Sequence, residues 1–332
     1  MNILYLSCHA TLEHEEVNIL RKLGHNVFTI GHYTDNIDIT RNNIEKNDPE
    51  LMLEYKSFHP NHKGGMPIKL NSSFLRHFDT IISSYWYENI LWNWEAVRSK
   101  RIIYRSIGLH SPGREEYFIP YKQHGLKILR MSPKERELPS YCGEDAIIRA
   151  SVNPDYFNKW KGNESNILTI QKYIRKSSIE RMWLEYNAVT NSFKNNRVLC
   201  GKLNEDIPYA LTDIKEDDLQ TLRRKSRVYF SLTTRCAVAT YTFVEAMMTG
   251  MPVVTVDKRL AGYNWFENPD FIENGVNGFK SNSVEEIKFY LSSLLKDTKL
   301  AKSISVEARK TMLQHFDPKV IEPQWKTFMD SL

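Results

Sequence analysis

Short apolar runs alternate with helical patterns along most of the chain. The run Asn2–Cys8 is followed by a helical pattern over Leu12–Leu23, which Gly24 ends. Such alternation indicates βαβ units around a parallel sheet, so the sequence predicts the α/β class. Isoleucine-rich runs of this kind suit strands that are covered on both faces. Further strands are predicted at Asn26–Ile30, Thr80–Ser83, Arg101–Tyr104, Lys127–Arg130 and Ala146–Arg149.

A polar stretch, Ser151–Asn166, interrupts the alternation and contains Pro154 and Gly162. We interpret it as a connection between two domains. Beyond it, helices are predicted near Ile179–Val189 and after Ser283, where Ser283 and Glu286 have the spacing of a capping box. Strands are predicted at Asn166–Ile170, Arg197–Cys200, Arg227–Leu232 and Pro252–Val256.

One long segment, His32–Ser73, has little periodicity and is punctuated by prolines and glycines. A loop of that length is usually functional or disordered. The basic part of this segment, His59–Lys69, and the run Arg223–Arg227 are candidates for contacts to phosphates.

The overall composition is that of an ordinary globular protein. The chain has 332 residues and a net charge of +5, which is lower than expected for a dedicated nucleic-acid binder. Its four cysteines show no metal or redox spacing. The amino terminus does not resemble a signal peptide, and no apolar run approaches the length of a membrane span. We therefore expect a cytoplasmic protein, with peripheral contact to a membrane left open.

The segment Arg227–Val256 carries the most information about function. It is predicted to form a strand, a loop, a helix and a second strand. Thr242 and Glu245 have capping-box spacing, so the helix is expected to begin near Phe243, and Gly250 should end it. The preceding loop would then bring backbone N–H groups to a helix N-terminus at the carboxyl edge of the sheet, where phosphate binds readily. The alternative is an ordinary capping glutamate without a ligand.

Three sequence segments resemble one enzyme family. Phe243–Thr255 (FVEAMMTGMPVVT) is similar to the donor-binding segment of the retaining group 1, or family 4-like, glycosyltransferases. Gly275–Phe279 and Ile147–Phe157 match what this family has downstream of that segment and before its second domain. The chain looks like a divergent, phage-like branch. Ala237 stands where the family usually has a second glutamate, which leaves the donor sugar and part of the mechanism open.

This resemblance implies the glycosyltransferase-B fold, which has two facing Rossmann-like domains with a cleft between them. Residues 1–150 would form the acceptor-side domain and residues 151–315 the nucleotide-sugar domain. A helix at 316–332, with Trp325 and Phe328, would pack back onto the first domain. The implied activity is transfer of a hexose or pentose from a nucleotide-diphosphate sugar with retention of configuration. The nucleotide sugar would be a co-substrate, and no cofactor is expected.

The resemblance also assigns donor-binding residues. Glu245 would bind the ribose hydroxyls, and amides of the preceding loop would bind the pyrophosphate. Cations after the first strand of the second domain would neutralise the leaving diphosphate, since charge develops there as the sugar bond breaks. A solvated basic strand end is the alternative for these cations. The predicted donor-binding residues are Lys172, Arg175, Arg235, Thr240, Tyr241, Thr242 and Glu245.

Candidates in the first domain follow its predicted strands. His110 lies near the position of a family histidine beside the sugar, and Arg105 is a second cleft candidate. Glu13 is predicted to accept the proton of the acceptor, and His9 is placed on the acceptor side. Trp86 is a further acceptor-side candidate, although aromatic clusters more often supply core area.

Several alternatives stay open. The acceptor is a glycan, a lipid-linked glycan, a protein or a hydroxymethylated base of DNA. A non-catalytic nucleotide-binding protein and a nucleotide-sugar epimerase are rival hypotheses. No recognisable metal-ligand set is present, so metal-independent transfer is expected. The protein would act as a monomer or a homodimer.

Overall fold

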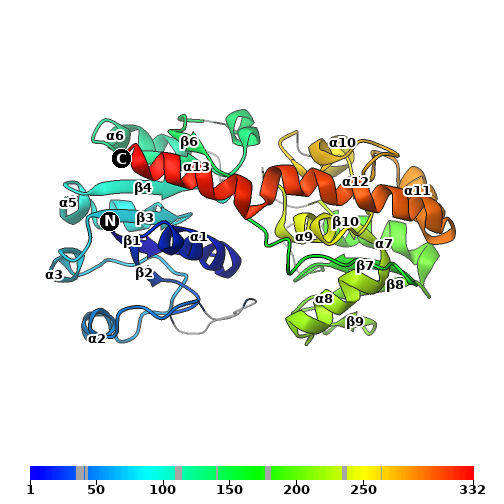
Figure 1. Ribbon diagram of the computed structural model, residues 1–332, viewed down its shortest axis with the longest axis horizontal. Helices are drawn as coiled ribbons and strands as arrows, with labels where there is room; N and C mark the ends of the chain where they lie inside the picture. Colours follow the sequence, from blue (N-terminus) through cyan, green and yellow to red (C-terminus); the bar gives the residue numbers. More distant parts are fainter. Residues whose placement is uncertain are drawn as a thin grey trace. The chain divides into compact units, whose positions relative to one another are not determined.

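The computed structural model describes residues 1–34, 41, 44–108, 114–139, 141–175, 181–233, 238–262 and 264–332. The chain divides into two compact units (Figure 1). The first unit comprises Met1–Ser151 together with Lys319–Leu332, and the second comprises Val152–Pro318.

The first unit is built on a parallel sheet in the order β2-β1-β3-β4-β5-β6. Each strand pairs in parallel with its neighbours, as the α/β prediction requires. The strands are β1 (Asn2–Leu6), β2 (Asn26–Ile30), β3 (Thr80–Ser84), β4 (Arg101–Arg105), β5 (Lys127–Arg130) and β6 (Ala146–Ile147).

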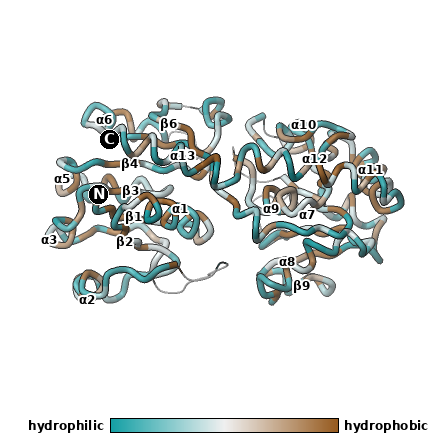
Figure 2. Tube along the Cα trace, in the orientation of Figure 1, coloured by the Kyte–Doolittle hydropathy of each residue, from teal (hydrophilic) through white to brown (hydrophobic). Residues whose placement is uncertain are grey.

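Alternate residues of these strands face two separate apolar layers. Leu4 and Leu6 of β1 belong to one cluster, which includes Tyr55 and Phe74 from the helices on that side. Ile3 and Tyr5 belong to the other cluster. That second cluster also holds Val17 of α1 (Ala10–Lys22) and Ile321, Trp325 and Phe328 of α13 (Pro318–Asp330). Burial on both faces explains why the strands are apolar throughout, and Figure 2 shows apolar stretches along the central strands.

The prediction that His32–Ser73 has no regular structure is wrong for part of this segment. It contains α2 (Pro49–Phe58) and the start of α3 (Ser72–Leu75). Asp48 caps α2, because its side chain accepts from the amides of Glu50 and Leu51, and Pro49 occupies the first turn. The apolar stripe was missed because α2 buries only Tyr55. The other short helices of this unit are α4 (Glu88–Leu91), α5 (Trp94–Val97), η1 (Arg114–Phe118), α6 (Ile119–Lys122) and η2 (Pro133–Glu137).

The second unit has a parallel sheet in the order β12-β11-β10-β7-β8-β9. Its strands are β7 (Glu164–Ile170), β8 (Arg197–Cys200), β9 (Ala210–Leu211), β10 (Ser226–Ser231), β11 (Val253–Val256) and β12 (Phe279–Ser281). Its helices are α7 (Arg181–Thr190), η3 (Asn191–Phe193), α8 (Glu216–Lys225), α9 (Tyr241–Thr249), α10 (Lys258–Ala261), η4 (Asn268–Phe271), α11 (Val284–Lys296) and α12 (Thr298–Phe316).

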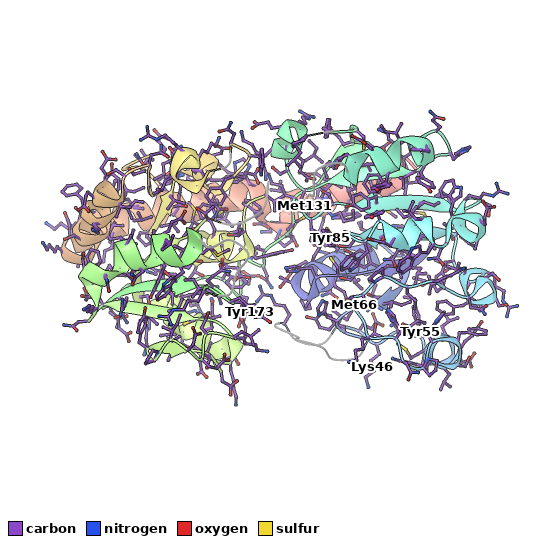
Figure 3. The ribbon with its side chains drawn as sticks, turned by 180° about the vertical axis from the view of Figure 1, so that it is seen from behind. Lys46, Tyr55, Met66, Tyr85, Met131 and Tyr173 are labelled. Carbon is purple, nitrogen blue, oxygen red and sulfur yellow. The ribbon has the colours of Figure 1, made fainter. Side chains whose placement is uncertain are left out.

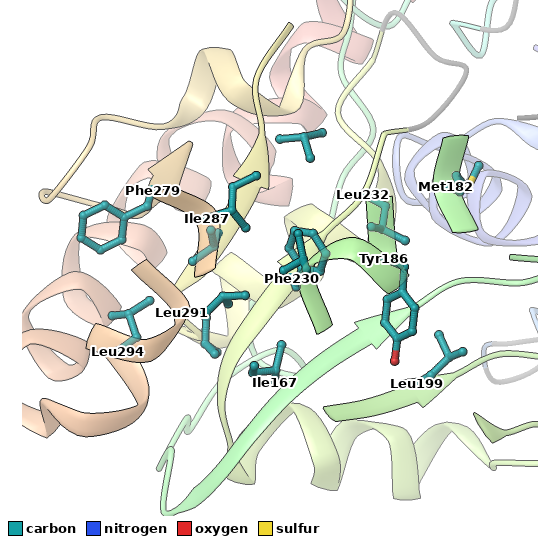
Figure 4. Packing of buried hydrophobic residues seen from close by; sticks show 14 of the residues in the cluster. Ile167, Met182, Tyr186, Leu199, Phe230, Leu232, Phe279, Ile287, Leu291 and Leu294 are labelled. Atoms are coloured by element: carbon teal, nitrogen blue, oxygen red, sulfur yellow. The ribbon is translucent and has the colours of Figure 1, made fainter. Parts of the chain in front are cut away.

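This sheet is also covered on both faces. On one face Ile167 and Phe230 pack with Tyr186 of α7 and with Ile287 and Leu291 of α11 (Figure 4). On the other face the neighbouring strand residues pack against α9 and α12, through Met247, Met248, Ala308 and Met312 among others. Two complete parallel sheets confirm the predicted α/β class.

Within the part of the chain that the structure describes, no helix is long and apolar enough to cross a membrane.

Candidate functional site

The strands β8, β7 and β10 lie side by side in the second sheet, and all three run in the same direction. Their carboxyl ends therefore meet at one edge, which is where open parallel sheets bind ligands. The segments that follow these strands supply most of the predicted donor-binding residues. Those of the described part of the chain are Lys172, Arg175, Thr240, Tyr241, Thr242 and Glu245.

The helix that follows β10 begins two residues earlier than predicted. Thr240 is the N-cap residue and α9 starts at Tyr241, so the predicted start near Phe243 is wrong. Thr242 and Glu245 do not form a capping box, because Thr242 already lies inside the helix. The first helical hydrogen bond runs from the amide of Val244 to the carbonyl of Thr240. Gly250 ends the helix in a left-handed conformation, with φ of 92°.

Side chains hold the loop that leads into α9. The amide of Ala239 donates to Oε2 of Glu267 at 2.7 Å, and the amide of Thr240 donates to Oδ1 of Asn268 at 3.0 Å. At the start of the loop, the amide and hydroxyl of Thr233 donate to the buried carboxylate of Glu185. The loop is thus fixed at both ends. The amides of residues 241–243 precede the first helical hydrogen bond of α9.

Glu245 forms a buried ion pair. Its Oε2 lies 2.6 Å from Nη2 of Arg223, and the two side chains are 5% and 2% exposed. Arg223 comes from the last turn of α8 and also binds Glu216 at 2.8 Å and Gln220 at 3.3 Å. These contacts fix the positions of both buried side chains. Sequence analysis placed Arg223 only in a basic run. Its spacing of seven residues from Glu216 and three from Gln220 puts all three on one face of a helix, and this signal could have indicated that Arg223 has internal partners.

The two described cations after β7 differ in their surroundings. Lys172 is exposed. Arg175 is paired with Asp206 at 3.2 Å, and its guanidinium lies 4.1 Å from the ring centroid of Trp183. Arg175 therefore has an acidic and an aromatic partner on its exposed surface. Two further predicted residues, Arg235 and His110, lie outside the described residues.

Arg105, a buried arginine of the first unit, corrects the sequence analysis. Arg105 was predicted to face the substrate, but it is fully buried and pairs with Glu16 at 2.6 Å. Its Nη1 donates to the carbonyl of Arg130 at 2.9 Å, and Glu16 also accepts from the hydroxyl of Tyr5. Arg105 is the last residue of β4. It lies on the same face of the sheet as Ile103, and residues of α1 and α13 cover that face.

Glu13 is likewise internal, which contradicts its predicted role as a base that reaches the acceptor. One carboxylate oxygen accepts from the hydroxyl of Thr29 at 2.7 Å, and the other accepts from the amide of His32 at 2.8 Å. Burial raises the pKa of this carboxyl group, and the two hydrogen bonds oppose that shift. Glu13 therefore holds the turn that follows β2.

The turn is tightly packed at Gly31. A Cβ atom at Gly31 would lie 2.2 Å from Oε2 of Glu13. We expect Gly31→Ala to lower the free energy of unfolding by about 1–3 kcal/mol, because an added methyl group would force the carboxylate off its hydrogen bonds. Urea unfolding measures the change. A variant as stable as the wild-type protein would show that the carboxylate has room to move.

The two acceptor-side candidates lie after β1 and β3. His9 is exposed and is the N-cap of α1, where Nδ1 accepts from the amide of Leu12 at 3.3 Å. Trp86 is partly buried, and its indole N–H donates to the carbonyl of Gly65 at 2.8 Å. Both side chains thus have local structural roles at the carboxyl edge of the first sheet.

Among the residues that the structure describes, no three His, Cys, Asp or Glu side chains are grouped so that they could hold a metal ion.

Comparison with solved structures identifies the fold. The chain is similar to a glycosyltransferase from Rickettsia africae, with a TM-score of 0.66, 14% identity, and coverage of 99% of this chain and 97% of the other. Sucrose-phosphate synthase from Thermosynechococcus elongatus gives 0.65 and 13%, covering 100% and 98%. HepE from Anabaena, in complex with UDP and glucose, gives 0.66 and 12%, covering both chains fully.

These structures span the whole chain, so the likeness confirms the predicted glycosyltransferase-B fold with its two parallel sheets. No protein-family model and no curated protein matches the sequence.

Proposed function

We propose that this protein is a glycosyltransferase that takes a sugar from a nucleotide-diphosphate donor, with UDP sugars as the first candidates. The observation that carries the proposal is the N-terminus of α9 at the carboxyl edge of the second sheet, with the buried carboxylate of Glu245 one turn inside the helix. The fold adds support, because HepE of this fold has been solved in complex with UDP-glucose.

Each described group has a role in this proposal. The first-turn amides of α9 and the positive end of its dipole would bind the diphosphate. Glu245 would accept hydrogen bonds from the ribose hydroxyls, with Arg223 holding the carboxylate in position. As the bond between sugar and phosphate breaks, negative charge moves onto the leaving diphosphate, and the exposed ammonium of Lys172 would stabilise it. We propose metal-independent transfer with retention of configuration.

The acceptor is proposed to be a glycan rather than DNA. The DNA hypothesis relied partly on the run Arg223–Arg227, but the three arginines of this run bind internal partners. Arg224 donates to the carbonyls of Asn158 and Tyr156, and Arg227 donates to the carbonyls of Gly162 and Leu295. Arginines whose guanidinium groups already donate to internal acceptors are poorly placed to contact a phosphate backbone and release its counterions.

The decisive experiment is a panel of nucleotide sugars incubated with the protein in the presence of EDTA. We expect release of nucleotide from one donor, and NMR of the product with a glycan acceptor should give the same anomeric configuration as the donor. Nucleotide binding without turnover of any donor would instead support the non-catalytic hypothesis. Conversion of a donor to its epimer would support the epimerase hypothesis.

A further inference from the structure

Two non-glycine residues at the carboxyl edge of the second sheet have left-handed backbone conformations. Tyr173, after β7, has φ of 54°, and Leu203, after β8, has φ of 68°. Residues with a bulky side chain rarely adopt this region, because Cβ crowds the backbone. Such strain persists only where the surroundings determine it, and it is concentrated at ligand sites.

A buried asparagine determines the conformation of both loops. Asn204 is fully buried, and its Nδ2 donates to the carbonyls of Gln171 at 2.7 Å and Gly201 at 3.0 Å. Its Oδ1 accepts from the amide of Ile174 at 2.9 Å. The loop after β7 and the loop after β8 are therefore tied together by one side chain.

The close approach of the two loops adds to this restraint. A Cβ atom at Gly201 would lie 2.3 Å from the carbonyl oxygen of Gln171, so a side chain is excluded there. The amide of Tyr173 donates across the gap to the carbonyl of Lys202 at 3.4 Å. Tyr173 and Leu203 thus project from neighbouring, mutually fixed segments.

Both strained residues expose apolar side chains. Tyr173 is 46% exposed and Leu203 is 39% exposed; Figure 3 labels Tyr173 within its loop. Core packing does not account for the strain, because neither side chain belongs to an apolar core cluster of the second unit's described residues. Each residue also follows an exposed lysine, Lys172 and Lys202 respectively. The side chains of Tyr173 and Leu203 offer an apolar surface for a planar ring. The neighbouring lysines offer positive charge for phosphate groups attached to that ring.

We propose that Tyr173 and Leu203 bind the nucleobase of the donor, with the ring of Tyr173 stacking on the base. This inference rests on the proposed function, and it names residues that the family resemblance does not assign. The site is continuous with the proposed diphosphate site, since β8, β7 and β10 are adjacent and α9 follows β10. Stacking tolerates any base, so these residues supply affinity, and base selection falls to other groups.

The test uses the nucleoside diphosphate that the wild-type protein binds most tightly in a calorimetric panel of UDP, dTDP, GDP and ADP. Inorganic pyrophosphate serves as the probe without a base. We expect Tyr173→Gly to weaken the nucleotide about tenfold and to leave pyrophosphate unchanged. Leu203→Gly should have the same effect to a smaller extent. Neither variant should lower the melting temperature, because glycine relieves the left-handed strain.

Two variants serve as controls. Tyr173→Phe keeps the ring and should bind the nucleotide like the wild-type protein. Lys159→Gly removes another exposed side chain at a positive φ, 63°, outside the proposed site. It should leave nucleotide affinity unchanged, which separates relief of strain from loss of stacking.

The outcomes distinguish the inference from the proposed function. Unchanged nucleotide affinity in Tyr173→Gly would overturn the inference alone. A parallel loss of nucleotide and pyrophosphate affinity would do the same, since it would mean that Tyr173 only shapes the loop. If the wild-type protein binds none of the four nucleotides, the proposed function itself fails.

Discussion

Replacing Arg223 by methionine is expected to lower the free energy of unfolding by about 3–5 kcal/mol, because it leaves the carboxylate of Glu245 buried without its cation. The same logic applies to Glu245→Ala, which would leave the guanidinium of Arg223 with fewer partners. Either single variant therefore mixes a change in stability with any change in nucleotide binding. Neither one alone can test the proposed role of Glu245.

The double variant Arg223→Met with Glu245→Leu separates the two effects. Replacing a buried ion pair by apolar side chains of similar volume is often neutral or stabilising, so most of the lost stability should return. The ribose contact would remain absent, and we expect nucleotide affinity to stay at least about tenfold below that of the wild-type protein, roughly 1.4 kcal/mol. Chemical denaturation and calorimetric titration measure the two quantities.

A binding comparison of ribonucleotides with 2′-deoxyribonucleotides tests the ribose contact of Glu245 directly. A carboxylate that accepts from the ribose hydroxyls favours UDP over dUDP, because the deoxy compound lacks one donor. The double variant should bind both equally. A stable double variant with wild-type affinity and wild-type preference would remove Glu245 and Arg223 from the binding site.

Arg105→Met has the second-largest expected effect, a loss of about 3–5 kcal/mol in the free energy of unfolding. The substitution leaves the carboxylate of Glu16 buried without its cation, since both side chains are at most 1% exposed. Nucleotide affinity of the folded fraction should not change, because the proposed nucleotide contacts all come from the second unit. Urea unfolding and calorimetric titration of the same sample provide the comparison.

The ion pair between Arg98 and Glu95 supplies the matched control. These side chains are 61% and 78% exposed, so Arg98→Met should change stability by less than about 0.5 kcal/mol. A fully stable Arg105→Met protein that had lost turnover would instead restore the catalytic role that the sequence suggested for Arg105.

The positions of the strands follow closely from the sequence. The runs at Asn26–Ile30, Lys127–Arg130 and Arg197–Cys200 are strands with the same bounds in the structure. Their apolar character reflects burial on both faces, which is a local property of each run. The helix α2 was missed because its apolar stripe is weak. Only the capping residue Asp48 and the following Pro49 mark its start in the sequence.

The candidate site was only partly accessible to sequence analysis. Glu245 was located by its motif, but its capping role was wrong, and its partner Arg223 was assigned only to a basic run that could contact phosphates. The ends of the loop before α9 are held by Glu185 and Glu267, which no motif indicated. Capping-box spacing is common in sequences. It does not reveal which distant side chain pairs with the carboxylate of Glu245 or accepts a hydrogen bond from the loop amides.

The sequence by itself determined the positions of most strands, the parallel α/β class, and the segment around Glu245, because these depend on periodicity and on residues close together in the chain. Only the tertiary structure decided that Arg105 faces Glu16, that Glu13 closes the turn at Gly31, and that Asn204 joins two loops. The physical reason is that ion pairs and buried hydrogen bonds join residues far apart in sequence, and their partners exist only once the sheets have formed.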